Sequence, residues 1–215
     1  MADADLAQAE RQALCDLMMT LGPEQATLCE GWNADDLAAH LIVRERQPLA
    51  APGIVLGGPF ARYTARAMDR LIERHDFEEL VGLVRSGPPR LLRPADGAMN
   101  LVEFFVHHED LRRGSTEVST EVEPRADIVA LEDALWSQSR RRLKMLTRRL
   151  SDLDLTLSDP LRGDKHLGGG HRPVTMVGSI GEITLYLFGR RGAARVDLVG
   201  EPAACVELSG GRLGI

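Results

Sequence analysis

NLVEFFVHHEDLRRG, residues 100–114, sets ionisable residues inside a run of aromatic and aliphatic ones. Burying such groups is costly unless they are paired, neutralised or bound to a metal. On a helix, Glu103, His107 and Asp110 project from one face, because they are spaced by four and three residues. The surrounding apolar residues cover most of the helix, so we expect this polar face to look into a helical bundle. A solvent-exposed Glu-His pair is the alternative.

A second histidine lies far upstream, in ADDLAAHLIVRER (34–46). Asn33 is a good N-cap with Asp36 three residues later, so this stretch is predicted to be a helix with His40 on its buried side. A lone histidine there is usually a satisfied core residue. Together with Glu103 and His107, however, it would complete a site of two imidazoles and one carboxylate, which leaves positions open for water or substrate. Asp110 would not bind the metal itself but would orient the ring of His107.

The pattern is mostly helical from residue 4 to about 150 and changes after Ser151. Helices are expected up to Gly22-Pro23, at 34–46, and at about 60–74, 76–86, 98–113 and 125–150. We therefore predict an α+β protein in which an up-and-down helical bundle, residues 1–150, precedes a small α+β domain, residues 151–215.

Within the second domain, three short segments alternate apolar and polar residues and are predicted to be strands: DLDLTLSD, ARVDLVG and ACVELSG. GSIGEITLYLFGRRG is ambiguous between strand and helix, and its Glu182 and terminal Arg-Arg-Gly favour a helix. GDKHLGGGHRP (163–173) is interpreted as a flexible loop between strands.

Composition excludes several classes of protein. The net charge of −6 argues against a nucleic-acid binder, which would need a surplus of Lys and Arg. Three widely spaced cysteines without a CxxC pair argue against a disulfide scaffold and favour a reducing cytoplasm. No signal peptide is recognisable, and no stretch reaches the roughly 20 apolar residues needed to cross a membrane.

Three segments resemble a known family. CEGWNADDLAAHL (29–41) is similar to the Trp-containing loop and histidine-bearing second helix of the DinB-like metal-binding bundles, and EFFVHHEDLRRG (103–114) to their Glu-x-x-x-His helix. LYLFGRR (185–191) resembles an L-x-L-x-G-R segment in the small C-terminal domain of the mycothiol-dependent maleylpyruvate isomerase group. The resemblance covers both halves of the chain.

The resemblance implies that His40, Glu103 and His107 are the metal ligands, for zinc in most cases. It also implies that an arginine of the C-terminal domain, Arg190 or its neighbour Arg191, holds a substrate carboxylate. The candidate catalytic residues are Arg190, from this resemblance, and Asp110, from its place beside His107, although Arg-Arg-Gly would serve at least as well to close a helix. The expected partners are a small substrate and a low-molecular-weight thiol such as mycothiol, and the protein would be a monomer or a homodimer.

An open divalent metal lowers the pKa of a bound thiol. The favoured function is therefore a thiol-dependent isomerase or transferase, in which a metal-bound thiolate adds to an electrophilic carbon of a small substrate. A metal-dependent hydrolase, with Asp110 or Glu109 as base, is one alternative. The other is a non-catalytic protein that binds a metal, or an apolar ligand in its C-terminal domain. A fourth protein ligand, such as His108 or Asp110, would favour that structural role.

Overall fold

A computed structural model describes most of the chain, namely residues 2–47, 58–89, 96–114, 122–147 and 150–211. It divides into two compact units, Met1–Glu117 and Val118–Ile215. The predicted domain boundary after residue 150 falls inside the second unit, since the helix before it packs on a helix that follows the first strands.

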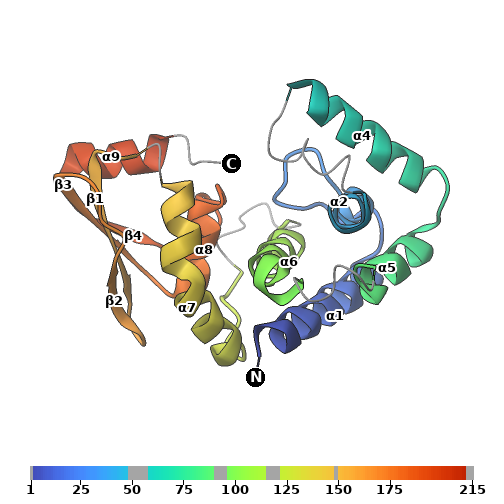
Figure 1. The fold of residues 1–215 in the computed structure, drawn as a ribbon, viewed down its shortest axis with the longest axis horizontal. Helices are drawn as coiled ribbons and strands as arrows, with labels where there is room; N and C mark the ends of the chain where they lie inside the picture. Colours follow the sequence, from blue (N-terminus) through green and yellow to red (C-terminus); the bar gives the residue numbers. More distant parts are fainter. Residues whose placement is uncertain (1, 48–57, 90–95, 115–121, 148–149, 212–215) are drawn as a thin grey trace. The chain divides into compact units, whose positions relative to one another are not determined.

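The described part of the first unit is helical (Figure 1). Helix α1 packs against α6 and α5, and α2 packs against α4 and α5. Their apolar faces form a buried core that includes Leu14, Leu37, Leu80 and Phe104. The bounds of these helices are α1 Asp3–Leu21, α2 Ala34–Arg46, α4 Gly58–Ile72, α5 Phe77–Ser86 and α6 Asp96–Arg113.

Local signals in the sequence explain the helix that carries His40. The Asn33 side chain accepts a hydrogen bond from the Asp36 amide at 3.0 Å, and the Asp36 carboxylate accepts one from the Asn33 amide at 3.1 Å. This reciprocal cap starts α2 where the sequence predicts it. Helix α1 ends at Leu21 and is capped by Gly22, whose φ of 84° suits glycine and which directly precedes Pro23.

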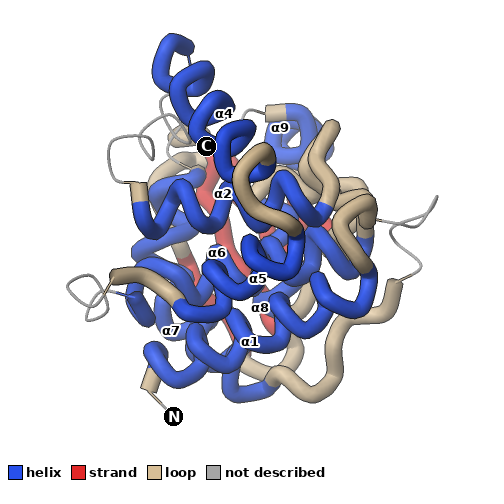
Figure 2. The backbone as a smooth tube through the Cα atoms, turned by 90° about the vertical axis from the view of Figure 1, so that its right-hand side faces the viewer, coloured by secondary structure: helices blue, strands red, loops and turns tan. Residues whose placement is uncertain are grey.

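The second unit combines helices with a small mixed sheet of order β2-β1-β3-β4 (Figures 1 and 2). Strands β1 and β3 are parallel, and the outer pairs are antiparallel. In β1, Leu153, Leu155 and Leu157 are buried and alternate with half-buried polar residues. The bounds are α7 Val129–Leu146, β1 Leu153–Asp159, β2 Gly163–His166, β3 Arg172–Val177, α8 Ile180–Leu187, β4 Asp197–Gly200 and α9 Pro202–Gly210.

The α+β class is confirmed, and so is the helix in the ambiguous segment: it is α8, which begins where Ser179 Oγ accepts a hydrogen bond from the Glu182 amide. Two local predictions are wrong. ACVELSG lies in helix α9, where Pro202 occupies the first turn and Ala204 and Leu208 are buried at helical spacing. GDKHLGGGHRP is not one loop but contributes β2 and the start of β3, because its ends pair with β1.

Among the described residues, no helix is both long and apolar enough to cross a membrane.

Candidate metal centre

The structure brings together the three residues that the sequence suggests as ligands. Helix α2 supplies His40, and α6 supplies Glu103 and His107 one turn apart. One ligand atom of each residue lies within 4.8 Å of those of the other two. The centroids of the two imidazole rings are 5.1 Å apart. This spacing would allow one ion to be bound by all three after small rotations of their side chains.

The cluster is buried on its imidazole side. His40 is 5% exposed and His107 is 6% exposed, whereas the Glu103 side chain is 27% exposed. His107 Nε2 lies 3.4 Å from Glu103 Oε2. The alternative of a solvent-exposed Glu-His pair is therefore wrong, because the histidine is enclosed.

Burial and neighbouring charges set the pKa values of the cluster. Burial lowers the pKa of His40 to about 3, with help from the charge of His107. Burial alone would raise the pKa of Glu103, but its hydrogen bond with His107 and the charge of Arg44 bring that pKa down to about 2. Burial alone would lower the pKa of His107, as it does for His40. Hydrogen bonds to Asp110, Cys29 and Glu103 nevertheless hold the pKa of His107 well above its ordinary value.

This donor set fits a divalent metal ion. His40 is neutral at physiological pH and Glu103 is ionised, which are the forms that bind metals. In the metal-free protein His107 contacts Glu103 through Nε2 and Asp110 through Nδ1. It would lose its Nε2 proton when the ion binds. Two imidazoles and one carboxylate are a common ligand set of catalytic zinc.

Asp110 contacts His107 on the side of its ring away from Glu103. Its Oδ2 lies 2.9 Å from His107 Nδ1 and its carboxylate is fully buried, so the other ring nitrogen, Nε2, faces Glu103. A carboxylate in this position fixes the tautomer and orientation of a ligating histidine.

Cys29 also lies at this centre, although its place in the sequence is compatible with either a packed thiol or a nucleophile. Its Sγ lies 3.3 Å from Asp110 Oδ2, so the same carboxylate oxygen contacts both Cys29 and His107. Cys29, His107 and Asp110 form a second group with closely spaced ligand atoms. The only sequence signal was the nearness of Cys29 to Gly31-Trp32.

The loop before α2 forms one wall of the centre. The Leu28 amide donates to the Asp110 carbonyl at 3.0 Å, which ties the loop to α6. Thr27 Oγ1 accepts from the Cys29 amide at 3.1 Å and donates to the Trp32 carbonyl at 3.0 Å. The loop thereby sets the Trp32 ring 4.9 Å from the His40 ring.

His108 and Glu109, which follow His107 directly on α6, contact residues outside the cluster. His108 Nδ1 lies 3.0 Å from Glu10 Oε1 on α1, so it does not join the cluster as a fourth ligand. Glu109 contacts Arg112 at 2.8 Å and Arg113 at 2.6 Å and is 1% exposed. Its carboxylate is thus committed to ion pairs, which weighs against its use as the base of a hydrolase.

Arg190 and Arg191 follow α8 in the second unit. Arg190 donates to the Phe188 carbonyl at 2.6 Å. Arg191 donates to the Gly211 carbonyl and lies over the Tyr186 ring, 5.7 Å from its centroid. Both have local structural contacts, and the carboxylate-binding role of Arg190 stays a prediction.

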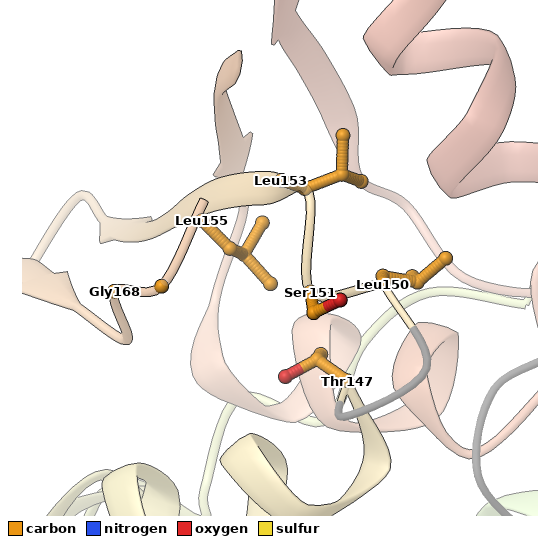
Figure 3. Close-up of a pocket in the computed structure, with 7 residues that line it drawn as sticks. Thr147, Leu150, Ser151, Leu153, Leu155 and Gly168 are labelled. Carbon is orange, nitrogen blue, oxygen red and sulfur yellow. The ribbon is translucent and has the colours of Figure 1, made fainter. Parts of the chain in front are cut away.

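The second unit also contains a cavity of about 210 Å³ (Figure 3). Leucines and a glycine loop form most of its wall, and its lining residues are Thr147, Leu150, Ser151, Leu153, Leu155, Gly168 and Gly169. Pockets for drug-sized ligands usually measure about 300–1,000 Å³. This cavity is therefore small for the apolar ligand of the non-catalytic alternative.

Comparison with solved structures identifies the fold. The crystal structure of the mycothiol-dependent maleylpyruvate isomerase superposes with a TM-score of 0.60 over 93% of this chain and 92% of that one, at 19% sequence identity. The chain has the maleylpyruvate isomerase fold. A histidine-to-alanine mutant of that enzyme gives the same TM-score and coverage at 17% identity. No family model matches the sequence, and no curated protein matches it significantly. The resemblance to the maleylpyruvate isomerase group thus holds for the fold of both halves of the chain.

Proposed function

We propose that this protein is a divalent-metal enzyme of the thiol-dependent isomerase or transferase type. The observation that carries the proposal is the buried cluster of His40, Glu103 and His107, two imidazoles and a carboxylate with no fourth protein ligand among the described residues. The maleylpyruvate isomerase fold supports the thiol-dependent reaction class. The proposed reaction is the addition of a thiol to an electrophilic carbon of a small substrate.

Each residue has a proposed task. His40, Glu103 and His107 would hold zinc. Asp110 would accept a hydrogen bond from His107 Nδ1 and so keep His107 Nε2 directed at the ion. The ion would supply a lowered pKa for a bound thiol. Arg190 is proposed to hold a carboxylate of the substrate. Mycothiol is the proposed thiol, the cytoplasm the proposed compartment, and the protein would act as a monomer or homodimer.

A hydrolase is less well supported. It would need a free base beside the ion, but Glu109 is paired with arginines, and Asp110 contacts His107 and Cys29. The small cavity of the second unit likewise gives little support to a carrier of apolar ligands.

Metal content tests the proposal first. Protein purified without chelator or affinity-tag metal should contain about one zinc ion per chain by elemental analysis, because three well-placed donors suffice for tight binding. Both His40→Ala and Glu103→Ala should lose most of it. His75→Ala is the matched control, since His75 lies between α4 and α5, where its Nδ1 is 3.2 Å from Glu79 Oε2. A wild type free of metal even after zinc is added would contradict the metal centre.

Thiol binding tests the reaction class. After cobalt substitution, mycothiol or a simple thiol should change the visible spectrum of the wild type by binding to the ion. A spectrum that no thiol changes, in protein with full metal content, would favour a hydrolase or a structural metal.

A further inference from the structure

A small cavity of the first unit lies where the C-terminal end of α2 meets the C-terminal end of α4. Its volume is about 140 Å³, and its lining residues are Gln47, Ala67, Arg70, Leu71 and Arg74. Gln47 follows His40 by seven residues, which is roughly 10 Å along a helix. The cavity is therefore separate from the candidate metal centre, and none of the proposed ligands lines it.

The cavity combines an apolar wall with three groups that donate hydrogen bonds. Ala67 is 5% exposed and belongs to the cluster that packs α4 against α2, and Leu71 is half-buried against the same cluster. Arg70 and Arg74 are exposed, and Gln47 is half-buried. Two guanidiniums and one carboxamide thus border an aliphatic wall. Ligand pockets typically combine apolar walls with a few polar groups of this kind, and guanidiniums bind carboxylates strongly.

The two arginines of the cavity are not engaged by the described part of the chain. Neither forms an ion pair or a side-chain hydrogen bond with a described residue, although the protein has a net charge of −6. By contrast, Arg46 of α2 donates to a backbone carbonyl at 2.9 Å, and Arg85 of α5 pairs with Asp16 at 2.7 Å. Arg70 and Arg74 are four residues apart, so their like charges repel each other. An anion between them would relieve this repulsion.

The acidic residues beside these arginines in the sequence do not compete with such an anion. Asp69 and Glu73 are each two residues from Leu71, and residues two apart on a helix do not face each other. Neither carboxylate pairs with Arg70 or Arg74 in the structure. The side of the helix that lines the cavity therefore carries positive charge only.

We propose that this cavity binds a small organic carboxylate. The carboxylate would accept charge-assisted hydrogen bonds from Arg70 and Arg74 and a further one from the Gln47 amide, and the apolar part would lie against Ala67 and Leu71. An engineered cavity of about 150 Å³ holds a benzene molecule, so an apolar part up to the size of a phenyl ring fits here. This site needs no metal ion and does not depend on the proposed function.

Calorimetric titration with benzoate tests the proposal, at low ionic strength because salt screens exposed charges. Benzoate should bind the wild type saturably. Arg70→Met and Arg74→Met should each weaken its binding by about tenfold, since each removes a charged hydrogen-bond donor. Arg66→Met is the matched control, because Arg66 is exposed one turn before Arg70 and does not line the cavity. It should bind benzoate as the wild type does.

Two further ligands separate the charge from the ring. Acetate has the carboxylate without the ring, and benzyl alcohol has the ring without the charge. Each should bind about tenfold more weakly than benzoate, because each lacks one of the two contacts that the cavity offers. Chelator is present throughout, so the metal centre is empty, and neither success nor failure here bears on the proposed function.

Three results would overturn the proposal. The first is a wild type that does not bind benzoate, and the second is unchanged binding in both Arg70→Met and Arg74→Met. The third is equal weakening by Arg66→Met, which would show that the arginines of α4 attract anions only through their summed charge. Acetate that binds as tightly as benzoate would likewise exclude a ligand held by the apolar wall. Circular dichroism of each variant checks that the helices are retained.

Discussion

His40 keeps its neutral form in the folded protein far below the pH at which a free histidine takes up a proton. Its pKa is about 3 when folded, against an ordinary value of 6.5, because burial penalises the charged ring. Between these two pH values, His40 therefore binds a proton in the unfolded chain but not in the folded chain. It follows that this residue's contribution to stability is complete above pH 6.5 and is lost as the pH falls toward 3.

His40→Gln should remove this pH dependence from the metal-free protein. Between pH 8 and pH 5, the free energy of unfolding of the wild type should fall relative to that of the variant by up to about 2 kcal/mol. The comparison must be made as a difference, because the raised pKa of His107 acts in the opposite sense: its contribution is present below pH 6.5 and is lost as the pH rises through the folded value. Urea unfolding with chelator present measures both proteins.

His75→Gln serves as the control for this experiment, since His75 lies outside the cluster, beside Glu79. It shows how much of any change comes from replacing a histidine elsewhere in the first unit. An unchanged slope in His40→Gln would contradict the burial of a neutral imidazole at this position.

The C-terminal end of α6 fixes the loop that forms a wall of the candidate metal centre. A Cβ added to Gly114 would lie 2.2 Å from the Ala26 carbonyl oxygen and 2.4 Å from Thr27 Cα, so the loop backbone approaches the glycine directly. Backbone atoms cannot move aside as a flexible side chain can. The loop that places Cys29 and Trp32 thus depends on a residue without a side chain at the end of this helix.

Gly114→Ala is therefore expected to destabilise the protein by about 1–3 kcal/mol, the usual cost of overpacking, and to weaken zinc binding. Gly82→Ala in α5 is the matched substitution: nothing lies within 4 Å of the added methyl group, and it should stabilise the helix by about 0.5–1 kcal/mol. Chemical denaturation measures both. If both substitutions changed the free energy of unfolding equally, the loop at Ala26 and Thr27 would be able to move away from the added methyl group at little cost.

The sequence predicted those features of the elements that depend on neighbours along the chain. The cap at Asn33 and the helical spacing of Glu103 and His107 are local, and the structure confirms both. ACVELSG was misassigned because so short an alternation also fits a helix that buries Ala204 and Leu208. The contacts of Cys29 with Asp110 and of Arg44 with Glu103 join different segments, and periodicity within one segment cannot reveal them.

At the scale of the whole molecule, the proposed metal ligands all belong to one of the two compact units. His40, Glu103 and His107 lie in Met1–Glu117, and each unit has one of the two tryptophans of the chain. Trp32 lies beside His40, whereas Trp136 is on α7 beneath Lys165. Fluorescence can therefore follow the two units separately.

Zinc should stabilise the first unit selectively, because a ligand that binds only the folded form adds about 2.7 kcal/mol at a hundredfold excess over its Kd. Trp136→Phe leaves Trp32 as the reporter of the first unit, and Trp32→Phe leaves Trp136 as the reporter of the second. In thermal unfolding, zinc should raise the midpoint seen by Trp32 by several degrees and leave that seen by Trp136 unchanged. Equal shifts in both would show that the two units unfold as one cooperative body, since stabilisation confined to the ligand-bearing unit cannot otherwise reach α7.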